Sequence, residues 1–187
     1  MLKNRLLLTA IALIILAGLL FWARRRAAQR APEIDLVAQF ETAEKRSNMP
    51  LTKAFEIRDL TVNGETRKSI FEHPTSRITW RITVPDDAVL RTWIALAPDA
   101  WNKEGDGVLF RVGVSDGARY QELAKEHVNP YAEQSDRRWR PITIDLSWYG
   151  GRQVDLIFNT NSSLPDKGDN AANDWAYWGA PAIYARE

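Results

Sequence analysis

The chain has 187 residues, of which 26% are charged, and it contains eight tryptophans and no cysteine. This length is typical of one domain with an appendage, and the absence of cysteine excludes disulfide scaffolds, thiol nucleophiles and thiolate-bound metals. The net charge of +1 is the sum of two unlike parts. Residues 1–30 hold six basic residues and no acidic residue, which leaves 19 basic and 24 acidic residues, a net charge of −5, for residues 31–187. An acidic domain argues against nucleic acid as a partner, because phosphates require a cationic surface.

An uncharged, apolar segment extends from residue 6 to residue 22. Its 17 residues would form a helix roughly 25 Å long, at the short end of a bilayer span. The residues expected at the membrane interface are Phe21, Trp22, Arg24, Arg25 and Arg26. We therefore expect residues 1–30 to be a single-pass anchor in the lipid bilayer of the inner (cytoplasmic) membrane, with a cleaved signal peptide as the alternative.

Residues 31–50 are expected to link this anchor to the globular domain. Within them, Ile34, Val37 and Phe40 recur at a spacing of three, which gives one apolar face. The spacing predicts a short juxtamembrane helix over residues 32–46. That helix would dock on the domain, on the membrane surface or on a partner protein.

From Phe55 onward, apolar residues recur with a period of two, which is typical of strands with one buried face. The alternation is clearest where Ile78, Trp80 and Ile82 are separated by polar residues, and Asn63-Gly64 is a turn signal. Seven or eight short strands are predicted, among them residues 55–60, 76–84, 89–97, 107–115, 140–147 and 153–160 and a final strand that contains Trp178. The pattern predicts an all-β, antiparallel jelly-roll β-sandwich over residues 51–187.

Three segments resemble a known kind of domain. They are GDGVLFRVGVSDG (105–117), RRWRPITIDLSWYGGRQVDLIFNT (137–160) and NDWAYWGAPAIY (173–184). They are similar to galactose-binding-like sandwiches, particularly the novel carbohydrate-binding module group. The positions that match the closing motif of that group are Asp174, Ala176, Trp178, Pro181 and Ile183. The resemblance covers about residues 76–185 and implies a jelly-roll fold. It is weak for the ligand, since such domains occur on exported and membrane proteins of many functions.

The aromatic residues of the domain divide into two groups. Trp80, Trp93 and Trp178 lie inside strands and are expected in the core. Other aromatic side chains could stack on a sugar ring, anchor a protein interface or simply pack under a loop. These candidate interface or ligand-platform residues are Trp101, Trp139, Trp148, Tyr149, Trp175 and Tyr177.

Acidic residues in two loops form a candidate calcium site. They are Asp106, Asp166, Asp169 and Asp174. Calcium takes six to eight oxygen ligands, and the sandwiches that this sequence resembles often hold one structural calcium. The alternative is that these acids are solvated turn residues. No other cofactor is expected.

Catalysis has little support in the sequence. His73 and His127 are the only histidines, and neither lies in a known nucleophile or metal motif. We therefore expect no enzyme. The main hypothesis is a non-catalytic, single-pass accessory subunit of a larger membrane protein complex, such as a photosynthetic or respiratory assembly. In this hypothesis the β-sandwich contacts the other subunits outside the bilayer.

Two alternatives to this hypothesis stay open. The first is a membrane-anchored carbohydrate-binding module that acts on envelope glycans, and the second is a hydrolase of an unrecognised kind. The domain is expected on the periplasmic or extracellular side, where domains of this type are more usual. The positive charges on the two flanks of the apolar segment differ by too little to fix the orientation.

Overall fold

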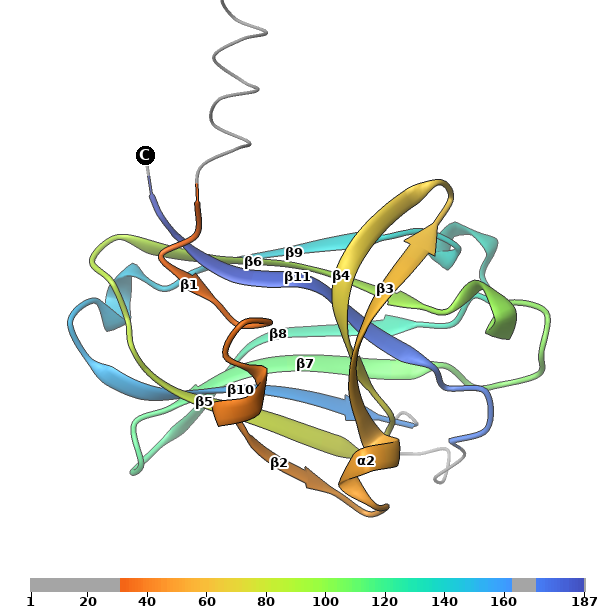
Figure 1. The fold of residues 1–187 in the computed structure, drawn as a ribbon, viewed down its shortest axis with the longest axis horizontal. Helices are drawn as coiled ribbons and strands as arrows, with labels where there is room; N and C mark the ends of the chain where they lie inside the picture. Colours follow the sequence, from red (N-terminus) through yellow and green to blue (C-terminus); the bar gives the residue numbers. More distant parts are fainter. Residues whose placement is uncertain (1–30, 163–170, 187) are drawn as a thin grey trace, which may run out of the picture. The chain divides into compact units, whose positions relative to one another are not determined.

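A computed structural model describes residues 31–162 and 171–186 (Figure 1). This part of the chain forms two antiparallel β-sheets that pack face to face, which confirms the all-β sandwich. The predicted span 6–22 and its flanking aromatic and arginine residues lie outside the described residues. Among the residues that are described, no helix has both the length and the apolar character needed to cross a bilayer.

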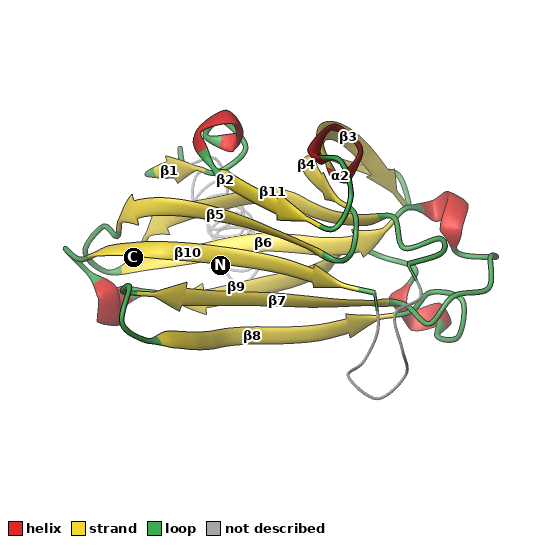
Figure 2. Cartoon of the chain, turned by 90° about the horizontal axis from the view of Figure 1, so that it is seen from below, coloured by secondary structure: helices red, strands yellow, loops and turns green. Residues whose placement is uncertain are grey.

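The two sheets contain six and five strands. In the six-stranded sheet the order is β3 (Phe55–Val62), β4 (Glu65–Glu72), β11 (Ala176–Ala185), β6 (Ala88–Leu96) and β9 (Arg140–Asp145), while β1 (Ile34–Asp35) also pairs with β11. In the five-stranded sheet the order is β2 (Glu44–Ser47), β5 (Ser76–Thr83), β10 (Gln153–Asn161), β7 (Val108–Ser115) and β8 (Tyr120–Val128). Figure 2 shows the five-stranded sheet in front.

The helical elements in the described part of the chain are each one turn long. They are the α-helix α2 (Leu51–Ala54) and the 3-10 helices η1 (Phe40–Thr42), η2 (Pro98–Ala100), η3 (Gln134–Asp136) and η4 (Ser147–Tyr149). The predicted hairpin turn is present between β3 and β4. Asn63 and Gly64 both have positive φ angles, 50° and 81°, as expected of a two-residue turn that matches the strand twist.

The core between the sheets is centred on four aromatic side chains that are at most 2% exposed. The ring centroid of Phe158 lies 5.1 Å from that of Trp80 and 4.4 Å from that of Trp178. Phe110 packs edge-on against Trp178 at 5.0 Å. Because Trp178 belongs to one sheet and the other three residues belong to the other, this cluster joins the two layers.

The helix predicted over residues 32–46 is wrong, because this segment contains β1, η1 and β2. The Asp35 carboxylate accepts hydrogen bonds from the backbone N–H groups of Val37 (2.9 Å) and Ala38 (3.1 Å), a local arrangement that competes with helix formation. The spacing of three therefore reflects a turn that buries Phe40 in the core. Since β1 and β2 extend the two sheets, the compact unit starts at Pro32 and not at residue 51.

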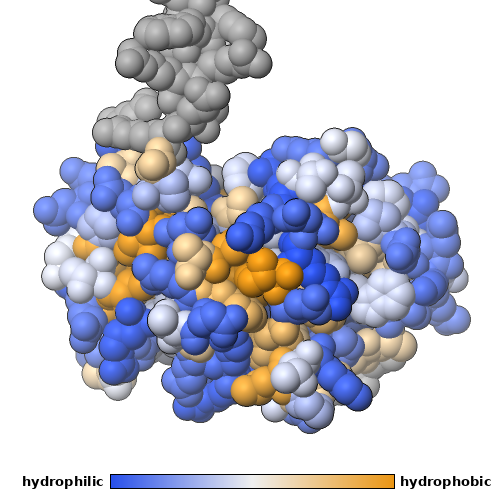
Figure 3. All heavy atoms as spheres, viewed as in Figure 1, coloured by the Kyte–Doolittle hydropathy of each residue, from blue (hydrophilic) through white to orange (hydrophobic). Residues whose placement is uncertain are grey.

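Figure 3 shows the surface of the same view. Hydrophobic surface gathers in the middle of this side and is surrounded by hydrophilic side chains. The large apolar side chains most exposed within the described residues are scattered over the chain and are Leu51, Tyr120, Tyr131 and Trp148.

Candidate functional site

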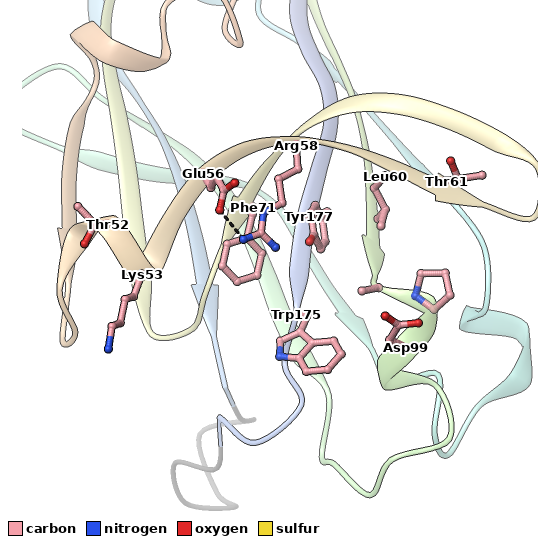
Figure 4. Close-up of a pocket in the computed structure, with 12 residues that line it drawn as sticks. Thr52, Lys53, Glu56, Arg58, Leu60, Thr61, Phe71, Asp99, Trp175 and Tyr177 are labelled. Atoms are coloured by element: carbon pink, nitrogen blue, oxygen red, sulfur yellow. Dashed lines mark hydrogen bonds and ion pairs between the residues drawn. The ribbon is translucent and has the colours of Figure 1, made fainter.

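A groove of about 750 Å³ opens beside the hairpin of β3 and β4 (Figure 4). Its walls come from α2, β3, β4, the turn at η2 and the start of β11. The lining residues are Thr52, Lys53, Glu56, Arg58, Leu60, Thr61, Phe71, Ala97, Pro98, Asp99, Trp175 and Tyr177. A concave site that combines aromatic side chains with a few polar groups is the usual form of a small-ligand site.

Aromatic rings form one part of this groove. Tyr177 is 5% exposed and its ring centroid lies 5.3 Å from that of Phe71, whereas Trp175 is half-buried. The Ala97 N–H donates to the carbonyl of Trp175 at 2.9 Å, which fixes the backbone at this point. Lys103 Nζ lies 4.2 Å from the centroid of the Trp175 ring. The indole is therefore held in place while part of it lines the groove.

Charged side chains form the opposite part of the groove. Arg58 and Glu56, both on β3, make an ion pair, and the Arg58 guanidinium lies 5.3 Å from the ring centroid of Phe71 (Figure 4). The hydrogen bond from Arg58 lowers the pKa of Glu56, and the Glu56 carboxylate, followed by Tyr177, raises the pKa of Arg58. Both groups are therefore charged at neutral pH, and together they offer donors and acceptors beside an apolar floor.

The structure brings together two of the six candidate platform residues. Trp175 and Tyr177 share the groove. Trp101 and Trp139 do not line the groove, although they belong with Tyr177 and Trp175 to a second apolar cluster on the outer face of the six-stranded sheet. Their indole N–H groups donate to backbone carbonyls, that of Trp101 to Leu96 at 3.1 Å and that of Trp139 to Glu65 at 3.0 Å. Both rings are thereby fixed as packing residues.

The other two candidates, Trp148 and Tyr149, belong to η4 and do not line the groove. Trp148 is 77% exposed. Tyr149 is half-buried against the core, and its hydroxyl donates to Gln121 Oε1 at 2.7 Å.

Two of the three tryptophans that are expected in the core lie there, and the third does not. Trp80 and Trp178 are buried between the sheets, as predicted. The prediction for Trp93 is wrong, because its ring is half-buried at the margin of the second cluster on the outer face. The guanidinium of Arg67 lies 3.5 Å from the centroid of the Trp93 ring. Trp93 therefore makes a cation–π contact on the outer face and does not pack between the sheets.

The candidate calcium site is only partly covered by the structure. Asp166 and Asp169 lie outside the described residues. Asp174 is 1% exposed, and Asp106 Oδ1 is buried without a hydrogen-bond partner among the described residues, an environment that suits a cation. Within residues 31–162 and 171–186, however, no three acidic or histidine side chains gather as metal ligands. Calcium needs more oxygens than two carboxylates supply, so its binding stays a prediction.

Sequence reasoning missed the polar half of the groove. Glu56 and Arg58 are two residues apart on β3 and therefore share a face, which was a usable signal. Asp99 carried no such signal, because it follows a different strand. Only the position of η2 beside the start of β11 brings Asp99 to the same groove.

No family model matches this chain. An uncharacterized protein of Archaeoglobus fulgidus is 35% identical over 131 residues, which cover 66% of this chain and 32% of that protein. The chain thus spans about a third of the length of this relative.

Solved structures provide the more informative comparison. The CBM51 domain of a Clostridium perfringens GH95 protein, solved in complex with methyl-galactose, has a TM-score of 0.53 and 14% identity, and the match covers 80% of this chain and 98% of that one. The CBM51-2 and INT domains of Clostridium perfringens ZmpB give a TM-score of 0.51 and 20% identity over 76% of this chain and 28% of that one.

These structures bear on the functional hypotheses. The similar structures are carbohydrate-binding modules, which counts against the hypothesis of an accessory subunit in a membrane protein complex, and we correct it accordingly. They favour the carbohydrate-binding alternative, whereas the absence of enzymatic activity stays a prediction. The chain therefore has a two-sheet β-sandwich fold similar to that of these carbohydrate-binding modules.

Proposed function

We propose that the β-sandwich is a carbohydrate-binding domain and that its ligand occupies the groove beside the hairpin of β3 and β4. The observation that carries the proposal is the position of Trp175 and Tyr177 beside the Glu56–Arg58 ion pair. The likeness to the Clostridium perfringens modules supports it at the level of the fold.

The chemistry of a sugar suits both halves of this groove. A pyranose ring has an apolar face of C–H groups that can stack on the Trp175 indole, and its hydroxyl groups need donors and acceptors. Glu56 accepts hydrogen bonds, Arg58 donates them, and Asp99 offers a second carboxylate. Because Arg58 and Glu56 already hold each other, the ligand orders few side chains when it binds, which limits the entropic cost.

The proposal includes a location. Residues 6–22 would anchor the chain in the inner membrane and present the groove to envelope glycans on the periplasmic or extracellular side. Extraction of membranes with alkaline carbonate tests the anchor. The chain is expected to stay in the membrane pellet, and its release into the soluble fraction would contradict the anchor without touching the binding proposal.

A binding experiment tests the main proposal. The full chain in detergent is screened on a glycan array. The affinity of the best ligand is then measured by calorimetry for wild type and for Trp175→Ala. Loss of the stacking platform is expected to weaken binding at least about tenfold. The matched control is Trp148→Ala, which removes an exposed tryptophan outside the groove and should leave affinity unchanged. Absence of any glycan binding, or equal affinity of Trp175→Ala and wild type, would refute the proposal.

A further inference from the structure

A row of cationic side chains crosses the outer face of the five-stranded sheet. The residues stand directly opposite one another on five neighbouring strands, in the order Arg46 (β2), Arg77 (β5), Asn159 (β10), Arg111 (β7) and Lys125 (β8). Residues that oppose one another in this way point to the same face of the sheet. Since like charges on facing strands repel, four cations in one row cost stability unless anions compensate them.

The compensation is incomplete in the middle of the row. Glu44 pairs with Arg46 and Glu122 pairs with Arg111, both from the next row of the same face. Within the described part of the chain, no carboxylate lies at ion-pair distance from Arg77, whose Nε donates to Asn159 Oδ1 at 2.7 Å. Burial raises the pKa of nearby Glu72 to about 8, so that this carboxyl is mostly protonated at neutral pH and does not neutralise Arg77.

A pocket of about 410 Å³ lies over this part of the row. Its lining includes Arg46, Arg77, Arg111, Asn159 and Asn161, and none of the described residues that line it is acidic. Asn161 has a buried side-chain oxygen that lacks a hydrogen-bond partner among the described residues. The pocket therefore combines an uncompensated guanidinium with an amide that still needs a partner, which is the chemistry of a site for an anion that also carries hydroxyl groups.

We propose that this pocket is a second ligand site, which binds the carboxylate of an acidic sugar between Arg77 and Arg111. Guanidinium groups bind carboxylates through paired, charge-assisted hydrogen bonds, and the Asn159 and Asn161 side chains line the same pocket. Because residues 31–187 have a net charge of −5, they favour a ligand with one anionic group over a polyanion such as nucleic acid. That the anion belongs to a sugar rests on the proposed function.

The experiment compares two ligands that differ only in the carboxylate. Methyl glucuronide and methyl glucoside are titrated into the full chain in detergent and followed by NMR. We expect binding of the glucuronide only, weakened by added NaCl and weakened at least about tenfold in Arg77→Ala and in Arg111→Ala. Arg77→Lys keeps the positive charge but loses the planar guanidinium group. Its affinity for methyl glucuronide should lie between those of wild type and Arg77→Ala.

Arg81→Ala is the matched control. Arg81 lies on the same strand and face as Arg77, but it is paired with Asp155 at 2.9 Å and does not line the pocket. Its removal should change the affinity less than twofold. Failure of wild type to bind glucuronide, equal affinities for the two sugars, or full affinity in both Arg77→Ala and Arg111→Ala would overturn the second site.

A third variant separates this inference from the proposed function. Trp175→Ala should keep its affinity for glucuronide while it loses the neutral glycan of the groove. If Trp175→Ala loses glucuronide as well, the acidic sugar sits in the groove, so that the second site is refuted and the groove is supported. If the groove binds no glycan but glucuronide binding depends on Arg77, the proposed site in the groove fails and the second site stands.

Discussion

The outer faces of the two sheets differ, although both sheets bury apolar side chains between them. The six-stranded sheet carries a second apolar cluster on its outer face, in which Trp139 and Tyr177 are almost fully buried. The outer face of the five-stranded sheet carries instead the cationic row around Arg77. The inward residues of each strand thus hold the sandwich together, while the outward residues decide which ligand chemistry each face offers.

Removal of a ring from the second cluster should give the largest effect on stability. Trp139→Ala leaves a cavity in a packed site and frees the Glu65 carbonyl, so we expect the free energy of unfolding to fall by about 3–5 kcal/mol. Urea titration followed by far-UV circular dichroism measures this change. A loss below about 1 kcal/mol would mean that the outer cluster covers the sheet without stabilising it.

The core beneath both faces should respond to pH through Glu72. Burial raises the pKa of this carboxyl to about 8, although Trp178 Nε1 donates to its Oε2 at 2.6 Å. The unfolded chain loses the proton near its ordinary pKa while the folded chain still holds it. The contribution of Glu72 to the free energy of unfolding should therefore be greatest below about pH 4.5 and fall as pH rises towards 8, by on the order of 4 kcal/mol.

Comparison with Glu72→Gln isolates this effect. Glutamine keeps an acceptor for the Trp178 indole and cannot ionise, so the variant should lack the decline that wild type shows between these pH values. Variants of the two outer faces, such as Trp139→Ala, should retain it. An equal pH dependence in Glu72→Gln and wild type would show that other groups cause the decline.

A pair of glycine variants compares the two faces directly. A methyl group on Gly179 would lie 2.8 Å from Trp139 Cζ3, and one on Gly113 would lie 2.4 Å from Tyr120 Cε2. Trp139 is held in the cluster, whereas Tyr120 is 46% exposed and can move away. Gly179→Ala should therefore cost about 1–3 kcal/mol and Gly113→Ala clearly less, as measured by thermal or urea unfolding. The reverse order would contradict the difference in rigidity between the faces.

The smallest effect is expected away from both faces. Trp148 in η4 is 77% exposed, so Trp148→Ala should change the free energy of unfolding by no more than about 0.5 kcal/mol. Urea titration beside Trp139→Ala gives the comparison between an exposed and a packed tryptophan. A loss as large as that of Trp139→Ala would contradict the difference between the exposed and the packed tryptophan.

Local sequence patterns predicted most of the strands but not all of them. The period of two located β5, which buries every second residue, and β10, which alternates from Gln153 to Leu156 before a fully buried stretch. It missed β8, an edge strand whose residues Tyr120 to His127 are exposed or half-buried and have no need to alternate. Likewise, the spacing of Ile34, Val37 and Phe40 predicted a helix because a turn followed by a single 3-10 turn also brings residues three apart to one side.

The sequence by itself determined the class of fold, the turn at Asn63-Gly64, the core positions of Trp80 and Trp178, and an acidic domain behind a basic amino-terminal segment. These follow from composition and from neighbours along the chain. Only the tertiary structure decided which aromatic rings line the groove and which are packed, because β3, η2 and β11 meet there from distant parts of the sequence. The cationic row has the same origin, since one residue from each of its strands comes into line only through the register of strand pairing.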